Sequence, residues 1–164
     1  MLIYSAPLAK WRCVYKKCSA QCCIGGRKVT AGDVKRIQGV TGMEPEEFAV
    51  LEDKKGLFRL RNRKDGDGCH FLRDDYSCEL HGTEGKPLLC RMYPFMFDGI
   101  VYGDEIFLKL KAVEDCPGLG KGEQLGANFE SQLEDLAGKF VRELKEYLKL
   151  KHEGLEGKKA LEDI

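Results

Sequence analysis

Cysteines are the residues of this chain whose type and spacing could carry chemistry. Four crowd into an eleven-residue stretch and four follow singly, in the order Cys13, Cys18, Cys22, Cys23, Cys69, Cys78, Cys90 and Cys116. The first four lie among lysine, serine and glutamine, where cysteines that serve only as small apolar side chains are not expected. Thiolates gathered this closely form a soft, anionic pocket that suits zinc or an iron–sulfur cluster. The sequence therefore predicts that all eight thiols are metal ligands, and that the cofactor is an iron–sulfur cluster or zinc.

The adjacent pair Cys22 and Cys23 adds a constraint. If this segment is extended, the two side chains point to opposite faces of the chain. They would then serve two metal ions, or two irons of one cluster, more easily than one shared tetrahedral ion. This favours an iron–sulfur cluster over zinc, with the cluster as a redox or catalytic centre.

The four single cysteines lie beside turn residues, as ligands carried on loops often do. Pro87 and Pro94 bracket Cys90 and stiffen its loop. Arg91 is then expected to turn its guanidinium toward the thiolate pocket or an acidic partner. Two histidines, His70 and His81, flank cysteines and could be ligands, although eight thiols make a plain hydrogen-bonding role the favoured one.

Composition limits the classes of partner. The 164 residues contain 27 lysines and arginines and 27 aspartates and glutamates, so the formal net charge is zero. This balance argues against a general nucleic-acid binder or a binder of anionic membranes. The protein partner or substrate is left open.

The cellular compartment decides whether the cysteines are reduced thiols or disulfides. The stretch 1–10 lacks the features of a signal peptide, and no run of 18 apolar residues could cross a bilayer. We therefore expect a cytoplasmic protein, where disulfides are rare and clustered thiols more often bind metal. Four disulfides are the alternative reading of the eight cysteines.

The elements that must position these thiols are read from periodicity and from start and stop signals. Thr30 and Asp33 predict the start of a helix whose buried face is Val34, Ile37 and Val40. A short second helix is expected over 45–48, and a half-buried strand over 57–63. Arg59, Arg61 and Arg63 on that strand could bind an anion, but a solvated face is favoured.

The second half of the chain predicts a hairpin and a long helix. Asp98 and Gly99 are expected to form the hairpin turn, with a further strand over 105–111. Apolar residues recur at helical spacing over 128–151. We expect one α+β domain over residues 1–164, with short antiparallel strands, flanking helices and a long C-terminal helix, and with 152–164 as a charged, frayed tail.

Taken together, the pattern resembles the YkgJ-like cysteine-cluster family, which is named after its CxxCxxCC motif and is thought to chelate zinc or iron. The resemblance covers about residues 13–118 and includes a counterpart for each of the eight cysteines. It also includes Thr30, Asp33, Thr41-Gly42, Phe48, Gly68, Phe71-Leu72, Pro87, Arg91-Met92-Tyr93-Pro94-Phe95 and Pro117-Gly118. The first motif departs from the family pattern, because its spacing is Cys-x4-Cys-x3-Cys-Cys rather than Cys-x2-Cys-x2-Cys-Cys.

Two other functions stay open beside a metal-holding protein. The family's relatives include a much longer flagellin lysine N-methylase, so the resemblance also allows a metal-dependent enzyme that modifies proteins. A zinc-stapled interaction module is the third reading. No Gly-rich phosphate loop and no recognisable Ser/His/Asp set accompanies the cysteines.

Overall fold

The computed structural model describes residues 2–5 and 10–164, so the N-terminal stretch 1–10 is covered only in part. The strands of this part are β1 (Leu2–Ser5), β2 (Lys10–Trp11), β3 (Lys28–Val29), β4 (Ala49–Lys54), β5 (Leu57–Leu60), β6 (Phe95–Tyr102), β7 (Ile106–Ala112) and β8 (Leu119–Gln124). The helices are α1 (Tyr15–Cys18), the 3-10 turn η1 (Gln21–Cys23), α2 (Ala31–Thr41), α3 (Pro45–Phe48), α4 (Leu88–Arg91), α5 (Ala127–His152) and α6 (Lys158–Asp163).

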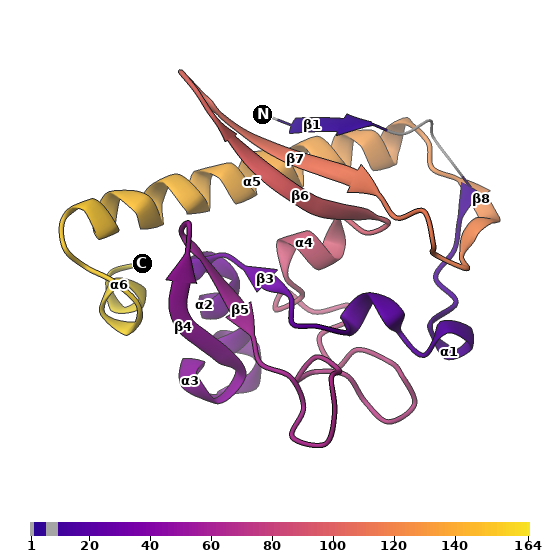
Figure 1. The fold of residues 1–164 in the computed structure, drawn as a ribbon, viewed down its shortest axis with the longest axis horizontal. Helices are drawn as coiled ribbons and strands as arrows, with labels where there is room; N and C mark the ends of the chain where they lie inside the picture. The colour runs from indigo at the N-terminus through magenta and orange to yellow at the C-terminus, as the bar shows by residue number, and fades with distance from the viewer. Residues whose placement is uncertain (1, 6–9) are drawn as a thin grey trace.

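The strands form three small sheets, and the predicted α+β class is confirmed. Their orders are β1-β7-β6, β3-β5-β4 and β2-β8. The pairs are antiparallel except that β1 joins β7 in parallel. The long C-terminal helix α5 runs along the β1-β7-β6 sheet, while α2 and α3 lie beside the β3-β5-β4 sheet (Figure 1).

Two apolar clusters form the core, and α5 contributes side chains to both. One cluster joins the β3-β5-β4 sheet, α2 and α6 and contains Phe58, Val34 and Tyr147. The other joins the β6–β7 hairpin and α4 and contains Leu108 and Phe140. The predicted long helix is confirmed, and its apolar stripe ties the two clusters together. Among the described residues, no helix has the length and apolar character needed to cross a bilayer.

The start of α2 is confirmed in detail. The Asp33 amide donates to Thr30 Oγ1 at 3.0 Å, and the Thr30 amide donates to Asp33 Oδ2 at 3.1 Å. Val34 and Ile37 are buried as predicted, but Val40 is 46% exposed, so its assignment to the buried face was wrong. The helix ends at Gly42, whose left-handed φ of 69° any other residue type would find strained.

The predicted hairpin turn at Asp98-Gly99 is wrong, because β6 runs through it. The register shifts between Phe97 and Gly99, so Asp98 lies in a bulge and makes an ion pair of 2.9 Å with Lys109. The chain turns instead after β6, where the Gly103 amide donates to the Glu105 carbonyl. A bulge with a glycine bends a strand without ending it, which is why a turn-like dipeptide can lie inside one.

The C-terminal stretch 152–164, expected to be a frayed tail, contains the helix α6. Its Ala160 and Leu161 are buried in the cluster around the β3-β5-β4 sheet. The Leu161 carbonyl accepts a hydrogen bond from Lys35 at 3.0 Å, and Lys158 pairs with Glu46 at 2.7 Å. Two apolar residues in a charged sequence are enough to dock this short helix on α2 and α3.

Candidate metal centre

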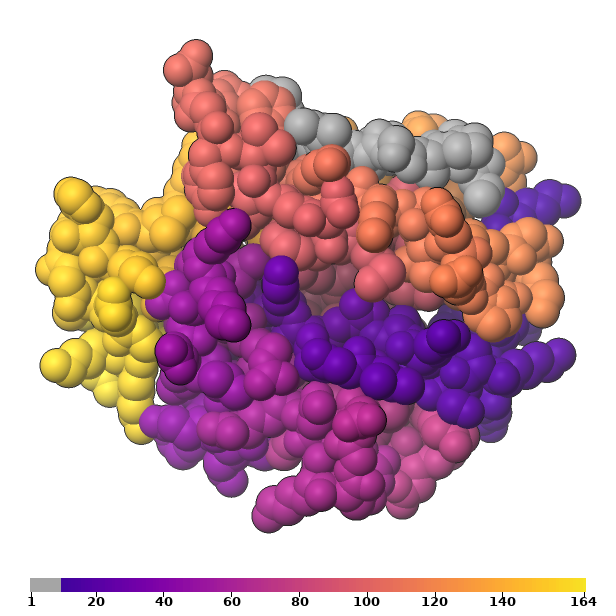
Figure 2. Space-filling model, viewed as in Figure 1, coloured from indigo at the N-terminus to yellow at the C-terminus, as the bar shows by residue number. Residues whose placement is uncertain are grey.

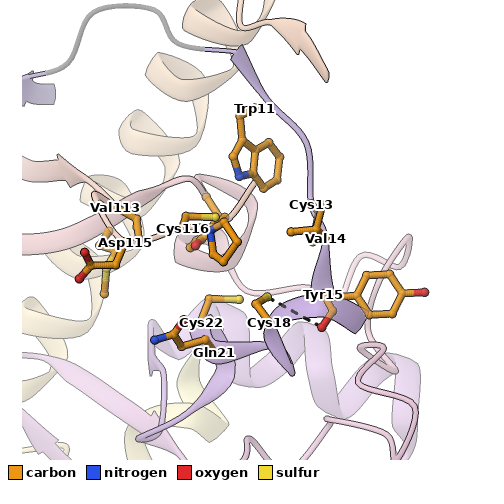
Figure 3. Close-up of a pocket in the computed structure, with 13 residues that line it drawn as sticks. Trp11, Cys13, Val14, Tyr15, Cys18, Gln21, Cys22, Val113, Asp115 and Cys116 are labelled. Atoms are coloured by element: carbon orange, nitrogen blue, oxygen red, sulfur yellow. Dashed lines mark hydrogen bonds between the residues drawn. The ribbon is translucent and has the colours of Figure 1, made fainter. Parts of the chain in front are cut away.

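Four of the predicted ligands surround one cavity of about 220 Å³. They are Cys13, Cys18, Cys22 and Cys116, and we call them the open set. The cavity opens between the segment that carries the first three and the segment that follows β7, and Figure 2 shows a hollow there. In Figure 3, Cys18, Cys22 and Cys116 turn into the same space, while Cys13 lies at its edge. The fold thus returns Cys116 to the N-terminal cysteines.

Tight turns of the chain bring Cys18 and Cys22 to this cavity. Helix α1 ends at Cys18, and η1 begins at Gln21. Between them Ser19 and Ala20 adopt left-handed backbone with φ of 51° and 49°. Such a conformation costs about 1–2 kcal/mol for a residue with a Cβ. Backbone held in this way is a mark of functional sites.

The loop of Cys116 is held against the strand that leads to Cys13. The Arg12 amide donates to the Gly118 carbonyl at 3.1 Å. A Cβ at Gly118 would collide with the Arg12 carbonyl oxygen, so only glycine allows this close approach. Burial and a hydrogen bond with Cys116 together raise the pKa of the Tyr93 phenol. Trp11 packs edge-on against Tyr93, with 5.5 Å between ring centroids.

Of the other four cysteines, Cys69 is buried and the remaining three are half-buried; we call these four the buried set: Cys23, Cys69, Cys78 and Cys90. The Cys69 amide donates to the Cys23 carbonyl at 2.8 Å. Cys69 is only 7% exposed, and Cys23 and Cys78 pack against the same apolar cluster. Burial and neighbouring thiolate charge raise the pKa of Cys69 to about 11.

Cys90 reaches the buried set from α4, which is tied to α2. The Leu88 amide at the start of α4 donates to Asp33 Oδ1 at 3.0 Å. Burial raises the pKa of Cys90 to about 12, and the charges of Cys69 and Cys78 raise it as well. Cys90 is thus the member of the buried set that α4 carries.

Cys22 and Cys23 are the junction between the two sets. Their segment is a 3-10 turn rather than an extended chain, and their sulfur atoms lie 3.9 Å apart. The thiol of Cys23 and the charge of Arg27 lower the pKa of Cys22, whereas the shared hydrogen bond and burial raise the pKa of Cys23. One member of the pair therefore loses its proton more readily than the other.

Arg27, which the sequence analysis did not single out, acts on cysteines of both sets. It hydrogen-bonds Cys22, and its charge lowers the pKa of Cys22, Cys69 and Cys90. Its Nε is buried and has no hydrogen-bond partner within residues 2–5 and 10–164. The only signal in the sequence is its position four residues after Cys23, just before β3.

The expectation for Arg91 was wrong. Its guanidinium faces neither an acidic partner nor the thiolates, because it donates to the carbonyls of Thr83, Glu84 and Lys86 at 2.9–3.1 Å. Arg91 therefore closes the loop that precedes α4. It can affect Cys90 only through the shape of that loop.

The remaining polar candidates have local partners. His81 Nδ1 lies 3.4 Å from Lys86 Nζ, and the His70 ring packs edge-on against Phe71. The strand predicted over 57–63 ends at Leu60, and beyond it Arg61 donates to the Glu46 carbonyl, while Arg63 pairs with Asp65 and Asp74. These contacts favour structural roles for the two histidines and for Arg61 and Arg63.

The two sets fit a thiophilic metal in the type and number of their donors. All eight cysteines are free thiols, and four of them face one cavity. Their positions are not those of a finished site: within the described ranges, no three His, Cys, Asp or Glu side chains are placed to hold a metal ion as they stand. The thiols would have to close around an ion when it binds, so their role as ligands stays a prediction.

A small α+β domain with a thiol-lined cavity beside a buried group of cysteines defines a class of metal-chelating domain. Residues 12–132 match the family model described as "CxxCxxCC: Putative zinc- or iron-chelating domain", and the chain belongs to this family. The predicted resemblance is thereby confirmed. Neither the curated proteins nor the solved structures contain a match.

Proposed function

We propose that this protein holds an iron–sulfur cluster or zinc through its cysteine thiolates. The observation that carries the proposal is the cavity of the open set, where Cys116 meets cysteines that precede it by almost a hundred residues. Thiolate donors suit both zinc and iron–sulfur clusters. A fold that used these residues only for packing would not gather them around an open cavity.

An iron–sulfur cluster is the favoured cofactor within this proposal. Support comes from the donor type, because each set offers four cysteines, the number of thiolates that an iron–sulfur cluster takes as ligands. When bound, the metal would supply redox or Lewis-acid chemistry at the cavity.

A redox or catalytic role is favoured over a purely structural one by the accessibility of the open set. Cys13 is exposed, and the cavity is open to solvent. Structural zinc sites are closed, whereas catalytic sites keep access for a water or substrate. The free state of all eight cysteines also supports a reducing compartment, such as the cytoplasm.

Metal analysis of anaerobically purified protein, combined with a visible spectrum, tests the proposal. A cluster gives a brown protein that dithionite bleaches, and zinc gives a colourless protein with stoichiometric metal. The variant Cys22→Ser should bind less metal than wild type, whereas Ser77→Ala, a control that keeps all eight thiols, should bind as much. Wild-type protein that binds neither zinc nor iron after anaerobic reconstitution would overturn the proposal.

A further inference from the structure

We propose that the eight thiols form two separate metal centres of four thiols each, which meet at the peptide bond between Cys22 and Cys23. This inference rests on the proposed function and adds which ligands share a centre. The open set would hold one centre at the surface, and the buried set would hold the other against the core. Arg27 would serve both centres as a common counter-charge.

The open set is a unit because its members line one cavity. The wall between them is apolar and aromatic, with Trp11, Tyr93 and Met96 among its residues. Asp115 is the one carboxylate that lines it. An ion in this cavity would therefore meet thiol donors from two sides of the hollow, and no cysteine of the buried set lines it.

The buried set is a unit because backbone pairing fixes its loops to one another. Ile24 pairs antiparallel with Gly68, so Cys23, which precedes Ile24, lies opposite Cys69, which follows Gly68. Leu72 pairs with Cys78, so Cys78 folds back over the chain that follows Cys69. These pairings place Cys23, Cys69 and Cys78 against the apolar cluster that includes Phe71.

Arg27 lies where the two sets approach each other. Its charge acts on Cys22 of the open set and on Cys69 and Cys90 of the buried set. Its buried Nε, without a partner in the described part of the chain, is a donor that an occupied centre could use. Two four-thiolate centres concentrate negative charge, and a shared guanidinium reduces it.

The two centres should differ in how fast they exchange their metal. A closed four-thiolate site shielded by the core is typical of a structural metal. An open site beside an exposed Cys13 should release its metal faster and meet external ligands. The proposal thus assigns the reactive metal to the open set and the stabilising metal to the buried set.

Cobalt(II) loading of the metal-free protein under anaerobic conditions tests the division, with bound cobalt per chain and visible thiolate bands as readouts. Wild type should bind about two ions, since tetrahedral sites take four ligands each. The same-set variant Cys13→Ser/Cys116→Ser should bind about one ion, because only the open centre is lost. The cross-set variant Cys116→Ser/Cys69→Ser carries the same number of changes and should bind none tightly.

Equal cobalt content in the two double variants would overturn the division. Failure of wild type to bind cobalt, zinc or iron would instead overturn the proposed function itself. Because the Cys69 variant could fail to fold, a second measurement does not use it. Transfer of cobalt to a chelator should show two phases, of which the fast one is absent in Cys13→Ser/Cys116→Ser, and a single phase in wild type also overturns the proposal.

Discussion

At the scale of residues, Arg27 and Arg91 can be compared, because each follows a cysteine closely in the sequence but only Arg27 acts on the thiols. Arg27 faces the thiols, whereas Arg91 holds three backbone carbonyls of its own loop. Loss of a group that orients or compensates metal ligands typically lowers metal affinity by about 10–100-fold. We expect this loss in Arg27→Gln, measured by competition with a chelator.

The control is Arg91→Gln, which should lower the midpoint of thermal unfolding of the metal-free protein and leave metal affinity nearly unchanged. Arg27→Lys should restore part of the affinity, because it keeps the positive charge. Equal losses of affinity in Arg27→Gln and Arg91→Gln would contradict the role of Arg27.

The left-handed backbone between Cys18 and Cys22 gives a second prediction. Ser19 has a φ of 51° and is exposed, so glycine at this position relieves strain without removing a buried group. We expect Ser19→Gly to raise the free energy of unfolding by about 0.5–1 kcal/mol, after the greater entropy of the unfolded glycine is subtracted. Urea denaturation measures it. The matched variant Lys17→Gly, within α1, should be destabilising, and a stabilising effect of both would rule out this explanation.

At the scale of elements, one carboxylate fastens the β4–β5 hairpin to α5. Asp53 is bound by Lys151 at 2.9 Å, by the Tyr147 hydroxyl at 3.0 Å and by the Gly56 amide at 3.0 Å. Burial alone would raise the pKa of Asp53, but these hydrogen bonds outweigh it and the pKa is lowered. The ionised form is therefore the one that holds the hairpin on the helix.

This lowered pKa predicts a specific acid dependence. The stability that Asp53 contributes is present above its unfolded pKa of about 3.9 and is lost as the pH falls through its lower native pKa. Asp53→Asn should cost about 1.5–3 kcal/mol at neutral pH, because a charged acceptor is removed. The difference between wild type and variant should shrink on acidification, as measured by denaturation between neutral pH and pH 3. The exposed control Glu52→Gln should show neither effect.

The elements also show which parts of the fold could be predicted from the sequence. The capping pair Thr30 and Asp33 and the stripe of α5 are local patterns, and both were predicted. Strand β8 was missed because its glycines give no strand pattern, and it exists through a long-range pairing with β2. Arg27 was missed for the same reason, since its neighbours come from distant loops.

The cysteines themselves show this limit most clearly. Their types indicated metal, and the resemblance to the family followed from their spacing. Their grouping could not be read from the chain, because Cys22 and Cys23 are adjacent in sequence and still lie in different sets. They are assigned to different sets because Cys22 lines the cavity that Cys116 completes, whereas Cys23 packs against the apolar cluster.

At the scale of the whole molecule, α5 should make the two apolar clusters unfold together. We propose a single folding unit, because Tyr147 belongs to one cluster and Phe140 to the other, both on one helix. Phe58→Ala and Leu108→Ala remove a buried side chain from each cluster and should cost about 3–5 and 2–5 kcal/mol. Both should lower the midpoint of one common transition, followed by far-UV circular dichroism and by calorimetry. Two separate transitions would contradict the shared unit.

Metal removal should not affect the molecule evenly. Residues 61–87 contain no helix or strand, and residues 13–27 contain only the short α1 and η1, so we expect both segments to depend on their thiols for order. Structural zinc contributes about 10–16 kcal/mol in small peptides, which is comparable to the stability of a whole domain. Hydrogen exchange of metal-free protein should show lost protection over 13–28 and 66–95 and retained protection in 128–151. Uniform protection with and without metal would show that the cysteines do not organise these loops.

The position of α5 after all eight cysteines has a consequence for biosynthesis. Chains emerge from the ribosome N-terminus first, and all eight cysteines precede α5. Neither apolar cluster can close until α5 has been made, because each includes side chains from it. The nascent protein therefore passes through an interval in which every thiol has emerged and no core yet shields the buried set. If the thiols hold metal as proposed, metal delivery and oxidation would compete for the cysteines in that interval, before α5 docks on the two clusters.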